Sequence, residues 1–250
     1  MQTRAENREE GQIVRAWGIA TDTVDEAFSL IEDVLAAHGM NFRDNVVRTW
    51  FYCDHILDWY REFNAARTDW FNAHGVFDTF LPASTGIGLA NPFGKRLYSG
   101  VIAADGAIGR RTVASPLQPP AMSYRSSFSR AAEMTVGDRR TLFVSGTAAI
   151  LPGTTCVAYV GDPVRQIDCA MRSALAIVES RGLSATDVSR SICYFKRPEY
   201  IPLYFDWVAA NLPGLPASSP LLDRSRFLIA DVCRDEWLFE VELDAEGASR

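Results

Sequence analysis

The sequence predicts an α+β protein built from two tandem, related domains. Strand-like and helix-like segments alternate along all 250 residues. The order of these segments in the first half recurs in the second half at a period of about 140 residues, which is too long for a solenoid and indicates two copies of one domain. A hydrophobic content of 48% with 22% charged residues supplies enough apolar material for the core of a soluble globular protein.

Net charge and cysteine usage bear on partners and location. A net charge of −6 without any Lys/Arg run argues against nucleic acid or an anionic membrane as a partner. No apolar stretch reaches the roughly 18 residues that cross a bilayer, and the polar start is unlike a signal peptide. Five cysteines without a CxxC pair, and three histidines without ligand spacing, indicate reduced thiols and no metal site. We therefore expect a cytoplasmic protein.

The first half predicts two helices between strands. Residues 1–12 are polar, and we expect them to be frayed. Asp22 or Thr23 can cap a helix that ends at Gly39. That helix has one apolar face, made by Ala27, Leu30, Ile31, Val34 and Leu35. The remaining predicted elements are strands at 13–20, 46–53 and 97–103, an extended segment at 81–88, and a helix from about 57 to 73.

The segment 141–162 predicts a hairpin in the second half. A strand at 142–144 is followed by a break of small residues, a Pro-Gly turn at 152–153 and a second strand from Cys156 to Val160. A helix then begins at about Pro163. Glycine and small hydroxyl residues at 145–148 allow another group to approach the backbone closely. A plain bulged hairpin is the alternative interpretation of this segment.

The repeat places a domain boundary. Residues 161–182 match 18–39, 187–194 match 45–52, and 216–219 match 82–85. Between the copies, residues 105–130 are rich in Pro, Ser, Gly and Arg and read as a connecting segment. We place an N-terminal domain at 1–114 and a C-terminal, catalytic domain at 115–250. The first domain is predicted to be truncated, because it has only the short strand at 13–20 where the second has the hairpin.

This order of elements resembles the RidA/YjgF superfamily. The motifs that carry the resemblance are the small-residue break, the Gly-Asp before the helix, and the Asp-Val before a strand with Tyr. The resemblance implies two chorismate-mutase-like domains, each a mixed sheet with helices packed on one face. It also implies sites between subunits of a trimer, so that this chain is expected to be a homotrimer or a monomer that forms a pseudo-oligomer by itself.

Five longer strings resemble the chorismatases, a two-domain branch of that superfamily. They are RTWFY (48–52), YREFNAAR (60–67), PASTGIG (82–88), YRSSFSRA (124–131) and VSGTA (144–148). The resemblance implies a cofactor-independent enzyme that converts chorismate to pyruvate and a cyclic acid. Ser84 and Ser218 stand where RidA-type imine deaminases have a carboxylate-binding Arg, which argues against imine hydrolysis. Tyr159 stands where many chorismatases have His.

Two glutamates on one predicted strand are candidates for acid catalysis. Glu240 and Glu242 alternate with apolar residues, so both point to one face. A carboxyl that faces inward stays protonated near neutral pH and can donate a proton, whereas on an exposed edge strand both would face solvent. The resemblance implies that Glu240 is the general acid and Glu242 is structural. The first copy has Ser99 at the position of Glu240, so we expect one site per chain.

Cys233 and Gly146 bear on the product. The resemblance implies that chorismatases forming 3-hydroxybenzoate have Cys and Gly at these positions, and that the hydrolytic ones have bulkier residues. Cys233 would then be a second catalytic residue. A small buried hydrophobic residue is the alternative for any cysteine, and we hold it for the other four.

Chorismate has two carboxylates, so its site needs cations despite the acidic chain. Arginine is preferred for bidentate recognition of carboxylates. The shared strings point to Arg130 and Arg67, then to Arg125 and Tyr124, as substrate-binding residues. Gly146 and Thr147 complete the predicted binding set.

The preferred hypothesis is a 3-hydroxybenzoate-forming chorismatase. A hydrolytic chorismatase that gives a dihydroxycyclohexadiene carboxylate, or a 4-hydroxybenzoate-forming relative, remains open within the same class. A non-catalytic RidA-like protein that binds a small carboxylate is the alternative from a different class.

Overall fold

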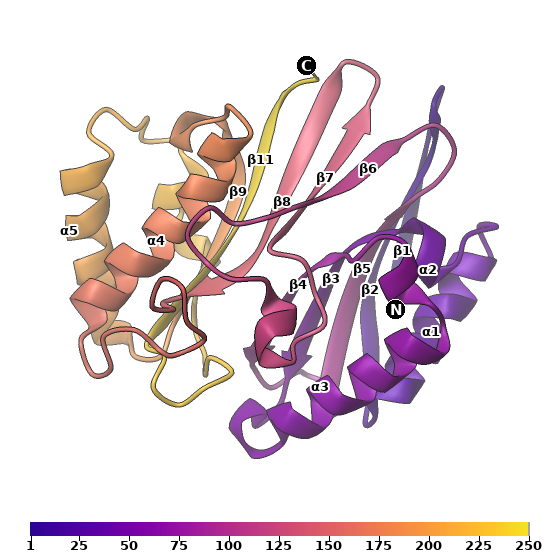
Figure 1. The fold of residues 1–250 in the computed structure, drawn as a ribbon, viewed down its shortest axis with the longest axis horizontal. Helices are drawn as coiled ribbons and strands as arrows, with labels where there is room; N and C mark the ends of the chain where they lie inside the picture. The colour runs from indigo at the N-terminus through magenta and orange to yellow at the C-terminus, as the bar shows by residue number, and fades with distance from the viewer. Residues whose placement is uncertain (250) are drawn as a thin grey trace.

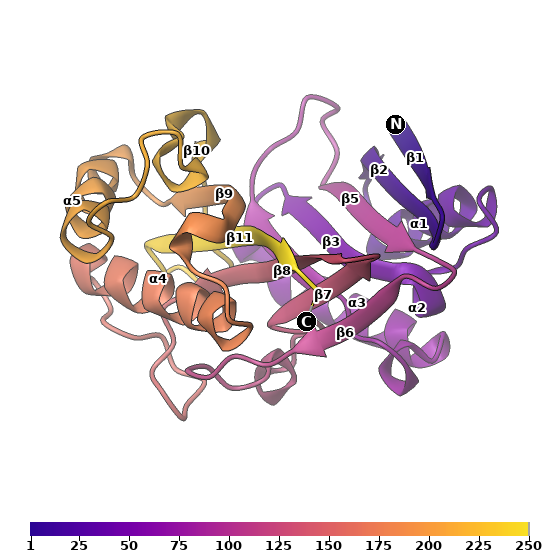
Figure 2. The same cartoon turned by 90° about the horizontal axis from the view of Figure 1, so that it is seen from above.

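Two mixed β-sheets pack face to face, and each carries its helices on its outer side (Figure 1). The structure is a computed structural model, and it describes residues 1–249. Figure 2 shows the same layers from above, with α4 and α5 on one side of the molecule and α1 and α2 on the other. The predicted α+β fold with two mixed sheets is therefore confirmed.

The first sheet has the strand order β1-β2-β5-β3-β4. The pair β3–β4 is parallel and the other pairs are antiparallel. The sheet is made of β1 (Gln2–Arg8), β2 (Gly11–Thr21), β3 (Val46–Cys53), β4 (Ala83–Gly88) and β5 (Leu97–Ala104), with helices α1 (Val24–Ala36), α2 (Phe42–Asn45) and α3 (Ile56–Ala73).

The second sheet has the order β10-β9-β11-β8-β7-β6. Its elements are β6 (Gly109–Val113), β7 (Ala131–Val136), β8 (Arg139–Ala148), β9 (Val188–Phe195), β10 (Phe227–Ile229) and β11 (Phe239–Ala248), with α4 (Pro163–Ser180) and α5 (Ile201–Asn211). Without β6, the order β7-β8-β11-β9-β10 repeats β1-β2-β5-β3-β4 strand for strand. The internal repeat predicted from the sequence is confirmed, and the first sheet lacks a counterpart only of β6. The hairpin expected to be missing from the first domain is present, because β1 and β2 correspond to β7 and β8.

Apolar clusters hold these layers together. One lies between the first sheet and its helices, and one between the second sheet and its helices. A third cluster, which includes Trp50, Ile102 and Phe143, lies between the two sheets. On α1 the predicted apolar face is buried except for Leu30, which is 40% exposed. The packed sheets fix the relative position of the two domains.

Two segments differ from the prediction. Residues 1–12, expected to be frayed, contain β1, which pairs with β2 from Gln2 opposite Trp17 to Arg8 opposite Gly11. The prediction of a hairpin at 141–162 is wrong, because β8 forms its hairpin with β7. After β8 the carbonyls of Ala148 and Ala149 accept hydrogen bonds from side chains, 2.7 Å from Gln118 Nε2 and 2.7 Å from Trp237 Nε1 respectively. Cys156 to Val160 is a loop with a single bridge from Val157 to Ile150, beside which the Ala158 N–H donates to the Ala149 carbonyl at 3.1 Å.

The chain passes from the first sheet to the second between β5 and β6, at residues 105–108. The strand β6 pairs with β7 in the second sheet. The domain boundary at residue 114 stays a prediction. Within residues 1–249, no helix combines the length and the apolar character needed to cross a membrane.

Candidate active site

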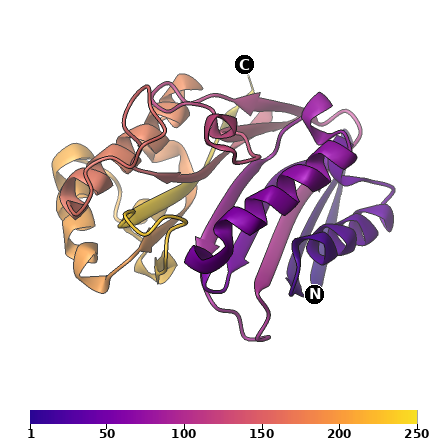
Figure 3. The same ribbon diagram turned by 60° about the horizontal axis from the view of Figure 1, so that its bottom comes forward.

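A cavity of about 750 Å³ opens between the two domains. Figure 3 shows α3 lying along the first sheet, with one end directed toward the second domain. The walls of the cavity come from α3 and β4 of the first domain, from β8 and β11 of the second, and from the segments 122–130 and 233–237. Segments far apart in the chain therefore meet around one space.

Glu240, the second residue of β11, lines this cavity and is 5% exposed. Burial, followed by the negative charge of Glu242, raises the pKa of Glu240 to about 8, against the smaller opposing effects of Arg130 and Arg48. No residue among 1–249 donates a hydrogen bond to its carboxyl group. The side chain is therefore mostly protonated near neutral pH, and its proton is available to a molecule in the cavity.

Gly146 on β8 is what allows the Glu240 carboxyl group to lie where it does. A Cβ atom at position 146 would overlap Oε1 of Glu240 and would come within 3.1 Å of Cγ2 of Thr85. The backbone N–H of Gly146 donates to Oγ1 of Thr85 at 3.0 Å, which holds β8 against β4 of the other domain. The need for glycine here is thus a need for space rather than for an unusual backbone conformation.

Arg67 and Arg130 both bring positive charge into the cavity, and each guanidinium lies less than 6 Å from the centre of the Phe128 ring. They are 2% and 4% exposed, and neither forms an ion pair with a carboxylate within residues 1–249. Arg67 donates to the side chain of Asn64, and Arg130 Nε donates to the carbonyl of Pro119 at 2.9 Å. Nε of Arg67 and Nη2 of Arg130 have no partner in the described chain. Buried charge without compensation is unfavourable, so these donors fit an anionic ligand.

Tyr124 and Arg125 lie on the short 3₁₀ helix η2 (Ala121–Tyr124) and directly after it, and both line the cavity. Tyr124 is half-buried, and the Arg130 guanidinium lies 5.2 Å from the centre of its ring. Burial raises the pKa of Tyr124 to about 12, so its hydroxyl stays a hydrogen-bond donor. Arg125 is exposed, so its charge lies at the rim of the cavity.

Cys233 lines the cavity as a neutral thiol. Burial, followed by the charge of Glu240, raises its pKa to about 12, against a hydrogen bond with Tyr60 that lowers it. A thiol with this pKa can donate or relay a proton, but it is a poor nucleophile at neutral pH.

The structure does not bring Thr147 to the cavity. This side chain is fully buried on the other face of β8, and its hydroxyl donates to the Ser145 carbonyl at 2.8 Å.

Several residues of the cavity wall were not singled out from the sequence. Tyr60, Asn64 and Arg67 lie on one face of α3, and their spacing of four and three residues could have revealed the first two. Arg234 is held by a hydrogen bond from Nη1 to the Thr155 carbonyl at 3.0 Å. Arg234 could not be predicted from the sequence, because it lies in a loop and belongs to no recognisable motif. The other additions with polar or aromatic side chains are Arg61, Thr68, Asp69, Ser84, Ser126, Ser127, Phe128 and Trp237.

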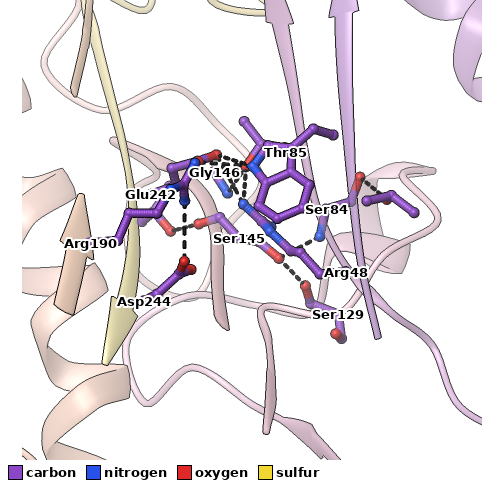
Figure 4. Close-up of polar contacts among 12 residues, drawn as sticks. Arg48, Ser84, Thr85, Ser129, Ser145, Gly146, Arg190, Glu242 and Asp244 are labelled. Atoms are coloured by element: carbon purple, nitrogen blue, oxygen red, sulfur yellow. Dashed lines mark hydrogen bonds and ion pairs between the residues drawn. The ribbon is translucent and has the colours of Figure 1, made fainter. Parts of the chain in front are cut away.

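Glu242 lies behind the cavity in a buried network between the domains (Figure 4). Its carboxylate accepts hydrogen bonds from Arg48 Nη2 at 2.9 Å, Trp50 Nε1 at 2.9 Å and Arg190 Nη2 at 2.7 Å. Burial would raise its pKa, but the charges of both arginines and hydrogen bonds from Thr85 and Trp50 outweigh burial and hold the pKa below its ordinary value. Glu242 is therefore a fixed negative charge that links the two sheets.

A second row of contacts closes the seam between the domains beside the cavity (Figure 4). The hydroxyl of Ser145 accepts from the backbone N–H of Ser84 at 2.9 Å and donates to the Ser129 carbonyl at 2.6 Å. Arg48 Nη2 also donates to Oγ1 of Thr85 at 2.6 Å. These contacts join the two domains next to Gly146 and Arg130 of the cavity wall.

Comparison with known proteins gives matches to chorismatases. A chorismatase from Streptomyces hygroscopicus is 26% identical over 220 residues, which are 79% of this chain and 60% of that protein. A chorismatase crystal structure has a TM-score of 0.71 at 21% identity, and the match covers 96% of this chain and 78% of that chain. This chain has the chorismatase fold. The resemblance predicted from the sequence is confirmed.

Two other comparisons gave a weak structural match and no family model. The YjgF gene product from E. coli is 19% identical, with a TM-score of 0.40 over 56% of this chain and 99% of its own. No family model matches the chain. The chain spans 60% of the length of the S. hygroscopicus chorismatase, so the activity of that whole protein carries over to this chain only as a proposal.

Proposed function

We propose that this protein is a chorismatase that converts chorismate to 3-hydroxybenzoate and pyruvate. The observation that carries the proposal is the pairing of a protonated carboxyl group with unpaired buried guanidinium groups around one cavity. Glu240 supplies the proton, and Arg67 and Arg130 supply positive charge for a dianionic substrate. A similar chain that is named a chorismatase supports the choice of substrate.

The first step is transfer of the Glu240 proton to the methylene carbon of the enolpyruvyl ether. This step leaves an oxocarbenium-like ether carbon and a Glu240 carboxylate. The neighbouring ring hydroxyl then attacks the ring carbon that bears the ether, the carbon–oxygen bond breaks, and pyruvate leaves. The hydroxyl proton returns to Glu240. General acid catalysis contributes on the order of 10²–10⁴-fold, so positioning of the dianion by the arginines must supply much of the remaining rate.

The ring intermediate then opens and loses a ring proton to become aromatic, and Cys233 assists this step as a neutral thiol. The thiol lines the same cavity as Glu240, and its raised pKa suits proton relay rather than nucleophilic attack. No water is consumed, because chorismate has the combined composition of 3-hydroxybenzoate and pyruvate. The hydrolytic alternative consumes one water and leaves a non-aromatic diol.

Incubation of the purified protein with chorismate tests the proposal. We expect stoichiometric pyruvate in a lactate dehydrogenase assay, and a product with the mass of a hydroxybenzoate that elutes with authentic 3-hydroxybenzoate and not with the 4-isomer. A product heavier than hydroxybenzoate by one water would show that the hydrolytic reaction takes place instead. Glu240 would remain the proposed acid in that case. Thermal stabilisation by chorismate without release of pyruvate would identify a binding protein and end the enzymatic account.

A further inference from the structure

A second hollow, of about 270 Å³, lies at the end of α4, away from the cavity between the domains. It is formed by β6, β7, the start of β8 and Arg181, which directly follows α4. Glu133 and Thr135 of β7 point into it, whereas Ala132 and Met134 between them belong to the core between the sheets. The hollow is therefore on the outer face of the second sheet. It shares no lining residue with the larger cavity.

Three guanidinium groups surround one carboxylate in this hollow. Glu133 Oε1 accepts a hydrogen bond from Arg111 Nε at 2.9 Å and forms an ion pair with Arg111 Nη2 at 2.7 Å. Arg181 also uses two donors, Nε to Oε2 at 3.0 Å and Nη2 to Oε1 at 3.4 Å. Arg140 Nη1 lies 3.5 Å from Oε2. Within residues 1–249 these three arginines contact no other carboxylate, so the cluster keeps an excess of positive charge in a chain whose net charge is −6.

Arg140 is the least satisfied member of the cluster. It is 5% exposed, and its Nη2 donates to the Arg181 carbonyl at 2.7 Å. Its Nε has no hydrogen-bond partner within the described chain. The contact with Glu133 is long, because Arg111 and Arg181 already occupy that carboxylate. Burying a guanidinium with an open donor is unfavourable unless an acceptor is supplied.

We propose that Arg111, Arg140 and Arg181 form a binding site for a phosphate group, either as inorganic phosphate or as part of a phosphorylated metabolite. Guanidinium forks match the oxygens of phosphate, and an excess of two positive charges suits a dianion. The side chain of Glu133 is 5% exposed, and its ion pairs with the three arginines fix the orientation of their guanidinium groups. Nη1 of Arg111 and of Arg181 is not used in these contacts and is free for the ligand. One water occupies about 30 Å³ of liquid, so the hollow has room for a phosphate with several waters.

Calorimetric titration of the full chain with inorganic phosphate tests the site, at an ionic strength held constant with potassium chloride. Arg67 and Arg130 in the larger cavity also attract anions, so an Arg130→Met variant is titrated alongside. We expect Arg181→Met to weaken phosphate binding at least tenfold and Arg130→Met to leave it unchanged. Arg139→Met is the matched control, because Arg139 is 72% exposed and pairs with Glu246 instead. Arg181→Met is expected to turn over chorismate like the wild type.

Two further arms complete the experiment. Should Arg181→Met fail to fold by circular dichroism, Arg111→Gln at a half-exposed position is expected to show the same tenfold loss. Tighter binding of glycerol phosphate than of inorganic phosphate would identify a metabolite site, and equal binding would identify a phosphate site. Absence of phosphate binding to the wild type would overturn the proposal. Loss of binding in Arg130→Met together with retention in Arg181→Met would overturn it as well, by assigning the phosphate to the larger cavity.

Discussion

Glu240 and Glu242 are two residues apart on one strand, point to the same face and are both buried, yet their environments are opposite. Glu240 faces a cavity, and the described chain gives its carboxyl group no hydrogen-bond donor. Glu242 accepts hydrogen bonds from Arg48, Trp50 and Arg190. The pKa of the first is raised to about 8 and that of the second is lowered.

Arg190 belongs to the same sheet as Glu242, but the other two donors come from the other domain. Arg48 and Trp50 lie on β3 of the first sheet and contact β11 of the second only because the sheets pack face to face. Their contacts keep Glu242 ionised, and its charge then favours the protonated form of Glu240. One strand therefore holds a protonated acid, Glu240, whose side chain faces the cavity, and a fixed anion, Glu242, whose side chain faces hydrogen-bond donors.

Replacing Glu240 by Gln gives the largest expected effect. The amide keeps the shape of the side chain but has no transferable proton, so we expect pyruvate release to fall by about 10²–10⁴-fold. The measurement is kcat with chorismate. Glu246→Gln on the exposed end of β11 is the matched control and should retain full activity. Activity of Glu240→Gln within a few-fold of wild type would remove Glu240 from the chemistry.

Gly146→Ala is expected to have the next largest effect on activity. The added Cβ atom takes the position of the Glu240 carboxyl oxygen, so this side chain must rotate away. We expect kcat to fall by roughly 10–100-fold, as for a displaced catalytic group. The Ala variant of Gly109, which has no positive φ and where an added Cβ atom would meet no atom nearer than 3.5 Å, controls for loss of a glycine as such. Unchanged kcat in Gly146→Ala would show that the carboxyl group acts from a different position.

Glu242→Gln should shift the pH dependence of activity. Loss of the negative charge lowers the pKa of Glu240, and the arginines freed by the substitution lower it further. For charges roughly 7 Å apart this corresponds to about one to two pH units, so the decline of kcat at high pH begins at lower pH. Breaking the buried ion pair also costs about 3–5 kcal/mol of stability, and rates must be measured where the variant is folded. A destabilised variant with an unshifted profile would mean that Glu242 is only structural.

Thermal stability gives the smallest effect. The folded-state pKa of Glu240 lies above its unfolded value, so its contribution to stability is present below about pH 4.5 and is lost as pH rises to about 8. Relative to Glu240→Gln, the wild type should therefore lose on the order of 5–10 °C in Tm between pH 5 and pH 8. Scanning calorimetry of both proteins checks this. Parallel Tm curves would contradict the raised pKa.

The sequence predicted much of this comparison, and the contacts across the domains explain what it did not predict. Alternation along 237–242 correctly gives both glutamates one face, but it contains nothing about Arg48, which is 194 positions from Glu242. The same alternation on β8 could have excluded Thr147 once Gly146 was assigned to the cavity. The hairpin predicted at 141–162 was wrong because both edges of β8 are already paired, one with β7 and the other with β11, and β11 is distant in sequence.

Direct titration of Glu240 tests the central claim most directly. Carbon-13 labelling of the glutamate carboxyl groups, with Glu240→Gln to assign the signal, follows its ionisation by NMR. We predict a pKa of about 8, with Glu242 ionised throughout the titration. A Glu240 pKa near the ordinary value of 4.5 would contradict the account, because the side chain would then be ionised at neutral pH and could not act as the acid.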